Sequence, residues 1–131
     1  MQSGGLNLFQ AIADKMRWHQ ARQGVLAENV ANADTPNYVE RDLAPFTVED
    51  GPGSAATLAL RATSPGHLAA TSAAGGFAIT SRAFEVSPSG NGVTLEDEMM
   101  KVAANDMDYQ TVTALYTRSV RIIKVALGRT A

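Results

Sequence analysis

The first part of the chain repeats apolar side chains at the alternating three- and four-residue steps of an amphipathic helix. Over residues 6–32 one stripe is mostly apolar and contains Phe9, Ile12, Met16, His19, Gln23, Leu26 and Val30. A stripe of this kind packs against a partner helix. At about 1.5 Å per residue, the predicted helix is roughly 40 Å long.

The same spacing returns in the last third of the chain and predicts a second helix, roughly 50 Å long. Thr94 is followed by acidic residues in a pattern that resembles a capping box. Gly128 stands where a left-handed residue is expected to end the helix. The stripe of this helix contains Leu95, Met99, Val102, Asp106, Tyr109, Thr113, Tyr116, Val120, Ile123 and Leu127.

Two long helices, one near each end of a short chain, are expected to pair through these stripes. The predicted helix-interface residues are the large apolar members of both stripes: Phe9, Ile12, Met16, Leu26, Val30, Leu95, Met99, Val102, Tyr109, Tyr116, Val120, Ile123 and Leu127. A second apolar set lies partly off the stripe of the C-terminal helix and contains Val112, Leu115, Ile122 and Val125. Because a helix pair buries only one stripe on each member, this second set predicts an oligomer.

The middle of the chain is rich in Gly, Ser and Pro and poor in large apolar residues. Short strand-like runs at residues 57–61, 77–80 and 83–86 predict a small β element or an ordered loop. The predicted fold class is therefore mainly α, a coiled-coil-like hairpin of terminal helices with a short irregular or β middle. The expected division is residues 1–36 for the N-terminal helix and turn, 37–93 for the middle, and 94–131 for the C-terminal helix.

A turn is predicted where the first helix ends, near residues 32–33. Asn and Asp side chains compete with the helical hydrogen bonds, and Thr35 before Pro36 is pushed out of the helical region. Asn37 then occupies a position that requires positive φ, where Asn is the best choice after Gly. Tyr38 is expected to face back toward packed surface, and residues 39–42 are expected to be extended.

Charge and composition exclude several classes of function. The chain has 131 residues, a formal net charge of −2 and no Cys. Its basic residues are scattered, so nucleic-acid binding is not expected. Without Cys there are no disulfides, thiolate metal sites or cysteine nucleophiles. No membrane-spanning segment and no cleaved secretory signal are predicted, so export would need a route without a cleaved signal.

No pattern of residues predicts catalysis, a metal site or a cofactor. His19 has Lys15 and Gln23 four residues to either side, so we interpret it as a helix-interface residue rather than a metal ligand. Ser64 and His67 lack a third orienting group for nucleophilic catalysis. The acidic residues 96–98, 106 and 108 do not have the spacing of a calcium loop and are interpreted as a solvated helix face. Trp18 is open to two interpretations, an anchor for a partner or part of an internal core.

The turn carries a recognisable motif. The sequence ENVANADTPNY at residues 28–38 resembles the signature of the flagellar rod and hook axial-protein family. The motif residues are Asn29, Ala31, Asn32, Asp34, Thr35, Pro36, Asn37 and Tyr38. Residues 22–23, 40–42, 46, 63–68 and 90–93, with the absence of a large inserted domain, are most similar to the proximal rod members of that family. Two departures are Asn37, where the family usually has Gly, and Ser89, where it usually has Asp.

The resemblance implies a non-enzymatic structural subunit of the bacterial flagellar basal body. It implies export by the flagellar type III apparatus without a cleaved signal, and polymerisation in the periplasm into a helical drive shaft whose innermost layer is made of terminal helices. The implied partners are other copies of the chain, other rod proteins, the rod/MS-ring junction protein FliE and, as a further candidate, the MS ring. No nucleic acid and no direct insertion into a membrane are implied. The alternatives are another axial rod protein, or a small helical adaptor or export chaperone.

Overall fold

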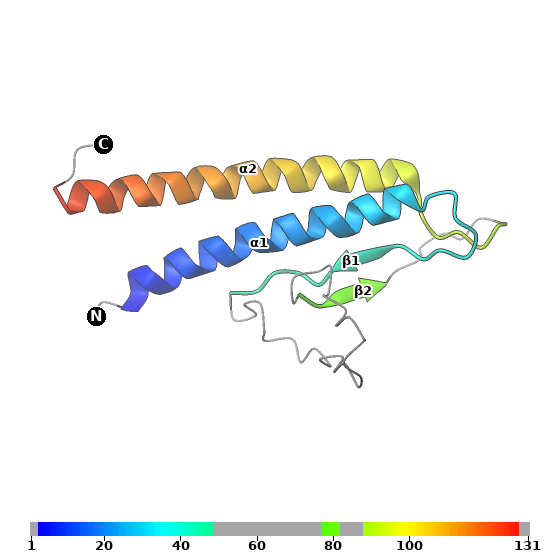
Figure 1. The fold of residues 1–131 in the computed structure, drawn as a ribbon, viewed down its shortest axis with the longest axis horizontal. Helices are drawn as coiled ribbons and strands as arrows, with labels where there is room; N and C mark the ends of the chain where they lie inside the picture. Colours follow the sequence, from blue (N-terminus) through cyan, green and yellow to red (C-terminus); the bar gives the residue numbers. More distant parts are fainter. Residues whose placement is uncertain (1–2, 49–76, 82–87, 129–131) are drawn as a thin grey trace, which may run out of the picture.

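The structure is a computed structural model that describes residues 3–48, 77–81 and 88–128. Two long helices dominate it, α1 (Ser3–Ala31) and α2 (Leu95–Ala126). They lie side by side and run in opposite directions, so that the start of α1 and the end of α2 lie at the same end of the hairpin (Figure 1). The predicted mainly α fold with paired terminal helices is confirmed. The division into residues 1–36, 37–93 and 94–131 stays a prediction.

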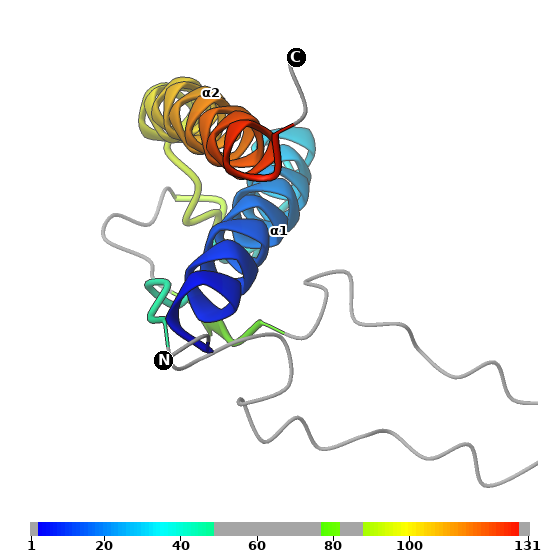
Figure 2. The same ribbon diagram turned by 90° about the vertical axis from the view of Figure 1, so that its left-hand side faces the viewer.

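The molecule has three layers, with α1 in the middle. The helix α2 packs on one side of α1, and a small sheet packs on the other side (Figures 1 and 2). The sheet consists of β1 (Arg41–Leu43) and β2 (Ile79–Ser81). Contacts of α2 with its own chain are therefore concentrated on α1, and the opposite face of α2 is left outside.

The two strands pair antiparallel, with Arg41 opposite Ser81 and Leu43 opposite Ile79. The hydrogen bond from Ala44 N to Ala78 O, 2.8 Å long, continues the pairing by one step. The extended backbone predicted at residues 39–42 is thus the approach to β1, and the predicted run 77–80 overlaps β2. The other two strand-like runs, 57–61 and 83–86, lie outside the described residues.

The core lies between α1 and the sheet. It consists of Trp18, Val25, Leu43 and Phe77, with Ala21 and Phe46 packed against them. Trp18 also donates a 2.9 Å hydrogen bond from its indole nitrogen to the carbonyl of Ala44. Trp18 and Val25 are not members of the predicted stripe of α1. This helix therefore buries a second face, and Trp18 belongs to the internal core.

The helix ends follow local chemistry, with one correction. Gly128 has a φ of 70°, the left-handed conformation predicted for the end of α2. Thr94 is the N-cap residue of α2, but its side chain makes no capping hydrogen bond. The predicted capping box is therefore wrong, and the helix begins with three acidic residues, Glu96, Asp97 and Glu98, in its first turn, where the helix dipole favours them.

Candidate assembly site

The turn that follows α1, residues 31–38, is called the elbow. Asn37 has a φ of 60°, which confirms the positive φ predicted there. Backbone hydrogen bonds from Thr35 N to Asn32 O and from Tyr38 N to Thr35 O close the turn. The motif residues Ala31, Asp34, Thr35, Pro36 and Asn37 are exposed, whereas Asn32 and Tyr38 are half-buried.

The end of α1 is held by a segment from the far side of the sequence. Asn91 is buried, and its side-chain amide donates to the carbonyls of Asn32 (2.9 Å) and Thr35 (2.6 Å). Its side-chain oxygen accepts a hydrogen bond from Val93 N. Asn91 therefore ties the turn after α1 to the residues that precede α2 by giving the carbonyls of Asn32 and Thr35 a second hydrogen bond each.

Gly90 lies directly against the elbow. Its φ is 78°, and a Cβ atom added there would lie 2.3 Å from the side-chain oxygen of Asn37. The backbone N–H of Asn37 donates to the backbone carbonyl of Ser89, and the backbone N–H of Gly92 donates to the backbone carbonyl of Tyr38. The elbow and residues 89–92 therefore form one hydrogen-bonded unit at the closed end of the hairpin, and the glycine is required for their close approach.

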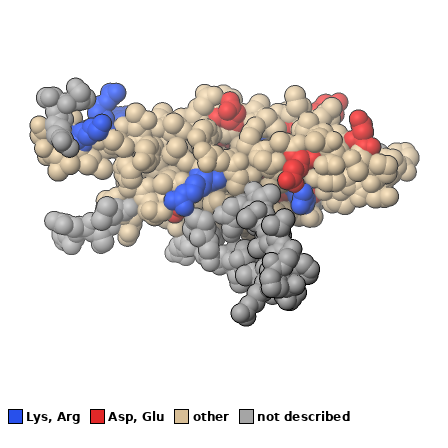
Figure 3. All heavy atoms as spheres, in the orientation of Figure 1, with Lys and Arg blue, Asp and Glu red and all other residues tan. Residues whose placement is uncertain are grey.

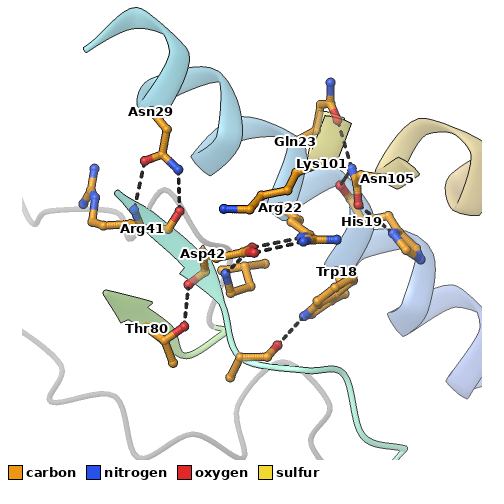
Figure 4. Close-up of polar contacts among 12 residues, drawn as sticks. Trp18, His19, Arg22, Gln23, Asn29, Arg41, Asp42, Thr80, Lys101 and Asn105 are labelled. Atoms are coloured by element: carbon orange, nitrogen blue, oxygen red, sulfur yellow. Dashed lines mark hydrogen bonds and ion pairs between the residues drawn. The ribbon is translucent and has the colours of Figure 1, made fainter. Parts of the chain in front are cut away.

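Asn29 is the buried centre of the motif. Its amide group donates to the carbonyl of Arg41 (2.6 Å) and to the carboxylate of Glu98 (2.8 Å). Its side-chain oxygen accepts from Arg41 N (3.0 Å) and from the hydroxyl of Tyr38 (3.2 Å). The contact of Tyr38 confirms that it faces back toward packed surface. One fully buried amide thus connects α1, the elbow, β1 and α2, and Figure 4 shows its two bonds to Arg41.

Glu98 continues this network into a cluster of charges. It is fully buried, and Lys101 donates to it at 2.7 Å and to Glu40 at 3.4 Å. Burial and the hydrogen bond with Glu98 raise the pKa of Glu40. Burial alone would lower the pKa of Lys101, but the hydrogen bond and charge of Glu98, with those of Glu40, raise it. The carboxyl groups of Glu40 and Glu98 therefore compete for the ammonium group of Lys101.

This cluster corrects the interpretation of the acidic run as a solvated helix face. Glu96 and Asp97 are exposed, but Glu98 has no exposed surface. A buried carboxylate is stable only when it is paired and hydrogen-bonded, and the partners Asn29 and Lys101 satisfy it here. Helical spacing places Lys101 three residues after Glu98, but it does not show that Glu98 is buried, because the second partner, Asn29, lies on α1.

A second ion pair ties α1 to β1. Arg22 donates from two nitrogens to the two carboxylate oxygens of Asp42, each at 2.9 Å (Figure 4). The hydrogen bond to Asp42 raises the pKa of Arg22, so the guanidinium stays charged. The guanidinium also lies 5.4 Å from the ring centroid of Trp18, within the range of a cation–π contact. Arg41 forms a further ion pair with Glu28.

His19 pairs with Asn105 in the middle of the hairpin, as Figure 4 shows. The ring Nδ1 of His19 lies 2.8 Å from the side-chain oxygen of Asn105. The amide group of Asn105 donates to the carbonyl of His19 and to Gln23, so its oxygen must be the acceptor and Nδ1 carries the proton. His19 is buried, which confirms that it is a helix-interface residue.

The predicted interface residues fall into three groups: buried, half-buried and exposed. Ile12 and Leu26 are buried, and the rings of Phe9 and Tyr116 pack with centroids 4.8 Å apart. Half-buried members of the stripes are Phe9, Met16, Val30, Val102, Tyr109, Tyr116 and Val120. The exposed predicted interface residues are Leu95, Met99 and Ile123 on α2 and Leu127 directly after it. Glu98 and Asn105, one position before Met99 and Asp106, are buried instead, so α2 is rotated slightly from the predicted orientation.

The helix α2 leaves many large apolar side chains exposed. Exposed apolar side chains occur along the whole helix: Leu95, Met99, Met100, Met107, Leu115, Ile122, Ile123 and Val125, with Leu127 just after it. Leu115, Ile122 and Val125 belong to the second apolar set that predicts an oligomer. Large exposed apolar side chains in this number on one helix indicate an interaction surface.

Several candidate sites can now be placed. Ser64 and His67 lie outside the described residues. Among residues 3–48, 77–81 and 88–128, no group of three or more His, Asp or Glu side chains could hold a metal ion. Neither α1 nor α2 is long and apolar enough to cross a membrane. Three residues of the hydrogen-bond network were not predicted as site residues: Glu98, Asn91 and Asn105. The position of Asn91, after a glycine and before a helix, is a signal for a cap, but this signal does not show that Asn91 binds the carbonyls of Asn32 and Thr35.

Comparison with known proteins identifies the class to which this elbow belongs. A family model described as "Flagella basal body rod protein" matches residues 18–38, from the middle of α1 through the end of the elbow. The region it covers contains Trp18, His19, Arg22 and Asn29 as well as the turn. The elbow and the helix that leads into it are therefore those of a flagellar basal-body rod protein.

Relatives over most of the chain are named "Flagellar basal body rod protein FlgB". One from Cereibacter sphaeroides is 36% identical over 82% of this chain and 84% of its own length. One from Escherichia coli is 34% identical over 78% of both chains, and one from Agrobacterium fabrum is 26% identical over 95% of both. The chain belongs to the FlgB family of structural rod proteins of the flagellar basal body.

Proposed function

We propose that this chain polymerises, with other rod proteins, into the proximal part of the flagellar drive shaft, which transmits torque and surrounds the export channel. The observation that supports this most strongly is the exposed apolar face of α2 on a chain whose relatives are rod proteins. The hairpin cannot cover this face itself, because α1 packs on the opposite side of α2. Neighbouring subunits would cover it.

The predicted interface residues that are exposed in the single chain would contact other subunits in this assembly. Leu95, Met99, Ile123 and Leu127 would contact neighbouring subunits, whereas Ile12 and Leu26 pack within the chain. Helices gain most of their stability from tertiary packing, so ordering of the outer helix and polymerisation would be coupled. The elbow residues 31–38 would fix the direction in which the helical hairpin leaves the outer part of the subunit.

The remaining proposals concern location and partners. We propose that the subunit reaches the periplasm through the flagellar type III export apparatus without a cleaved signal. Its neighbours there would be further copies of itself, other rod proteins, the junction protein FliE and, as a further candidate, the MS ring. Its role would be mechanical rather than catalytic.

The deciding experiment is deletion of the gene followed by complementation, with basal bodies examined by electron microscopy. We expect rods to be absent in the deletion strain and restored by the wild-type gene. Normal rods in the deletion strain would refute the proposed function.

Limited proteolysis separates a rod subunit from an adaptor or export chaperone. The free rod subunit should be cut readily in α2, and the same sites should be protected in isolated basal bodies. A chaperone would be protected equally in both preparations.

A further inference from the structure

The outer face of α2 differs in charge between its two halves. The N-terminal half carries the exposed acidic residues Glu96, Asp97, Asp106 and Asp108. The C-terminal half carries the exposed basic residues Arg118, Arg121 and Lys124. Figure 3 shows acidic side chains over the part of α2 next to the elbow and basic side chains at its opposite end. Two α2 helices aligned in register would place like charges together.

The two halves also differ in shape. Beside the C-terminal half lies a hollow of about 870 Å³, lined among the described residues by Tyr109, Gln110, Thr113, Ala114, Thr117, Arg118, Arg121 and Ile122. The N-terminal half instead presents flexible side chains, since Met99, Met100 and Met107 are 57%, 70% and 69% exposed. Methionine fills irregular apolar gaps well because it is unbranched and polarisable.

We propose that the N-terminal half of α2 in one copy of this chain docks into the hollow beside the C-terminal half of α2 in a second copy. The methionines would fill the hollow, and Asp106 and Asp108 would face Arg121 and Lys124, which lie 15 and 16 residues further along the helix. The two helices run parallel and are shifted by about half their length, roughly 24 Å. This inference rests on the proposed function, because a polar rod requires contacts that do not close.

Such a contact is heterologous: each copy offers one half of α2 and keeps the other half free. Heterologous contacts that do not close into a ring continue into open assemblies. An antiparallel arrangement would also bring opposite charges together, but it would close as a dimer. The number of copies that can be linked therefore distinguishes the two geometries.

The chain has no Cys, so every disulfide must join introduced cysteines. In the double variant Met100→Cys/Thr117→Cys, the two positions on one helix are roughly 26 Å apart, too far for a disulfide within the chain. Oxidation of the purified full chain should give a ladder of dimers, trimers and higher species. A product that stops at the dimer, or no product, would overturn the proposal. The control Asn7→Cys/Thr117→Cys, whose first site is exposed on α1, should stay largely monomeric.

Charge reversal tests the specificity of the contact. In the cysteine background, Arg121→Glu/Lys124→Glu and Asp106→Lys/Asp108→Lys should each lower the ladder yield about tenfold, and the combined fourfold reversal should restore it. These changes leave the buried Glu98 intact, and circular dichroism of each variant will show whether the helices are kept. Equal yields in all three variants would contradict the predicted pairing.

Cross-linking in cells separates this inference from the proposed function. In basal bodies, Met100→Cys/Thr117→Cys should link the chain to itself. If rods form normally but the cross-link joins the chain only to a different rod protein, the proposed docking of a second copy on α2 is refuted, whereas the proposed rod function stands. If rods form without the gene, the rod function fails whatever the purified chain does.

Discussion

Asn29 and Glu98 are joined by a hydrogen bond of 2.8 Å, and neither side chain has any exposed surface. The pair links α1 to α2 next to the elbow, where the motif of the rod proteins ends the first helix. Asn29 also binds the backbone of Arg41 through both of its polar groups. The motif residue that is most buried therefore sets the positions of three elements at once.

Replacement of Asn29 by Ala should destabilise the chain more than any change on the elbow surface. It leaves one carboxylate oxygen of the buried Glu98 without the Asn29 amide, although Lys101 still binds the other oxygen, and it removes both side-chain hydrogen bonds to the backbone of Arg41; we expect a cost of about 2–3 kcal/mol. Urea unfolding followed by circular dichroism measures the loss. Asn7→Ala, an exposed Asn on the same helix, is the control and should change stability by less than about 0.5 kcal/mol. Equal effects of the two substitutions would contradict the role of Asn29.

Two glycines should respond to Ala with opposite signs. Gly90→Ala places a methyl group 2.3 Å from the side-chain oxygen of Asn37 and strains a φ of 78°, so we expect a loss of about 1–3 kcal/mol. Gly24→Ala meets nothing within 4 Å inside α1 and should raise stability by up to about 1 kcal/mol. Thermal unfolding of both variants tests this, and a loss at Gly24 or none at Gly90 would contradict it.

Pro36→Ala should impair assembly while leaving the helices intact. Pro36 is exposed and precedes the left-handed Asn37, so its ring restricts the elbow without supporting α1. We expect reduced swimming in a complemented deletion strain, with an unchanged helical signal in the purified chain. Pro45→Ala, at an exposed proline outside the elbow, is the control. Full motility of the Pro36 variant would show that this restriction is unimportant.

Stability near Glu40 should depend on pH. Its pKa is raised above the ordinary value of 4.5, so the folded chain binds this proton more tightly than the unfolded chain does. The stability that protonated Glu40 contributes is complete below the pKa that Glu40 has in the unfolded chain. It is lost as the pH rises through the pKa that Glu40 has in the folded chain. Glu40→Gln should therefore gain stability relative to wild type as the pH rises above about 4.5. Urea midpoints across that range measure the difference, and a gain that appears instead at lower pH would contradict the sign.

The helices and the elbow could be predicted because their causes are local. The spacing of apolar residues over a few turns predicts α1 and α2. Pro36 and the Asn residues around it stop α1, and Asn37 has the positive φ that the turn requires. Each of these features depends on residues within about four positions, so no knowledge of the tertiary structure is needed.

Tertiary structure decided which faces are buried and by what. Asn91 and Thr35 are 56 positions apart, Asn29 and Glu98 are 69 apart, and His19 and Asn105 are 86 apart. No local pattern specifies such pairs, and a buried Glu looks the same in the sequence as an exposed one. The sequence by itself determined two amphipathic helices and the turn between them. The packing of α1 between α2 and the sheet decided that Glu98 would be inside and the outer face of α2 open, because a polar side chain can be buried only where its hydrogen-bond partners converge.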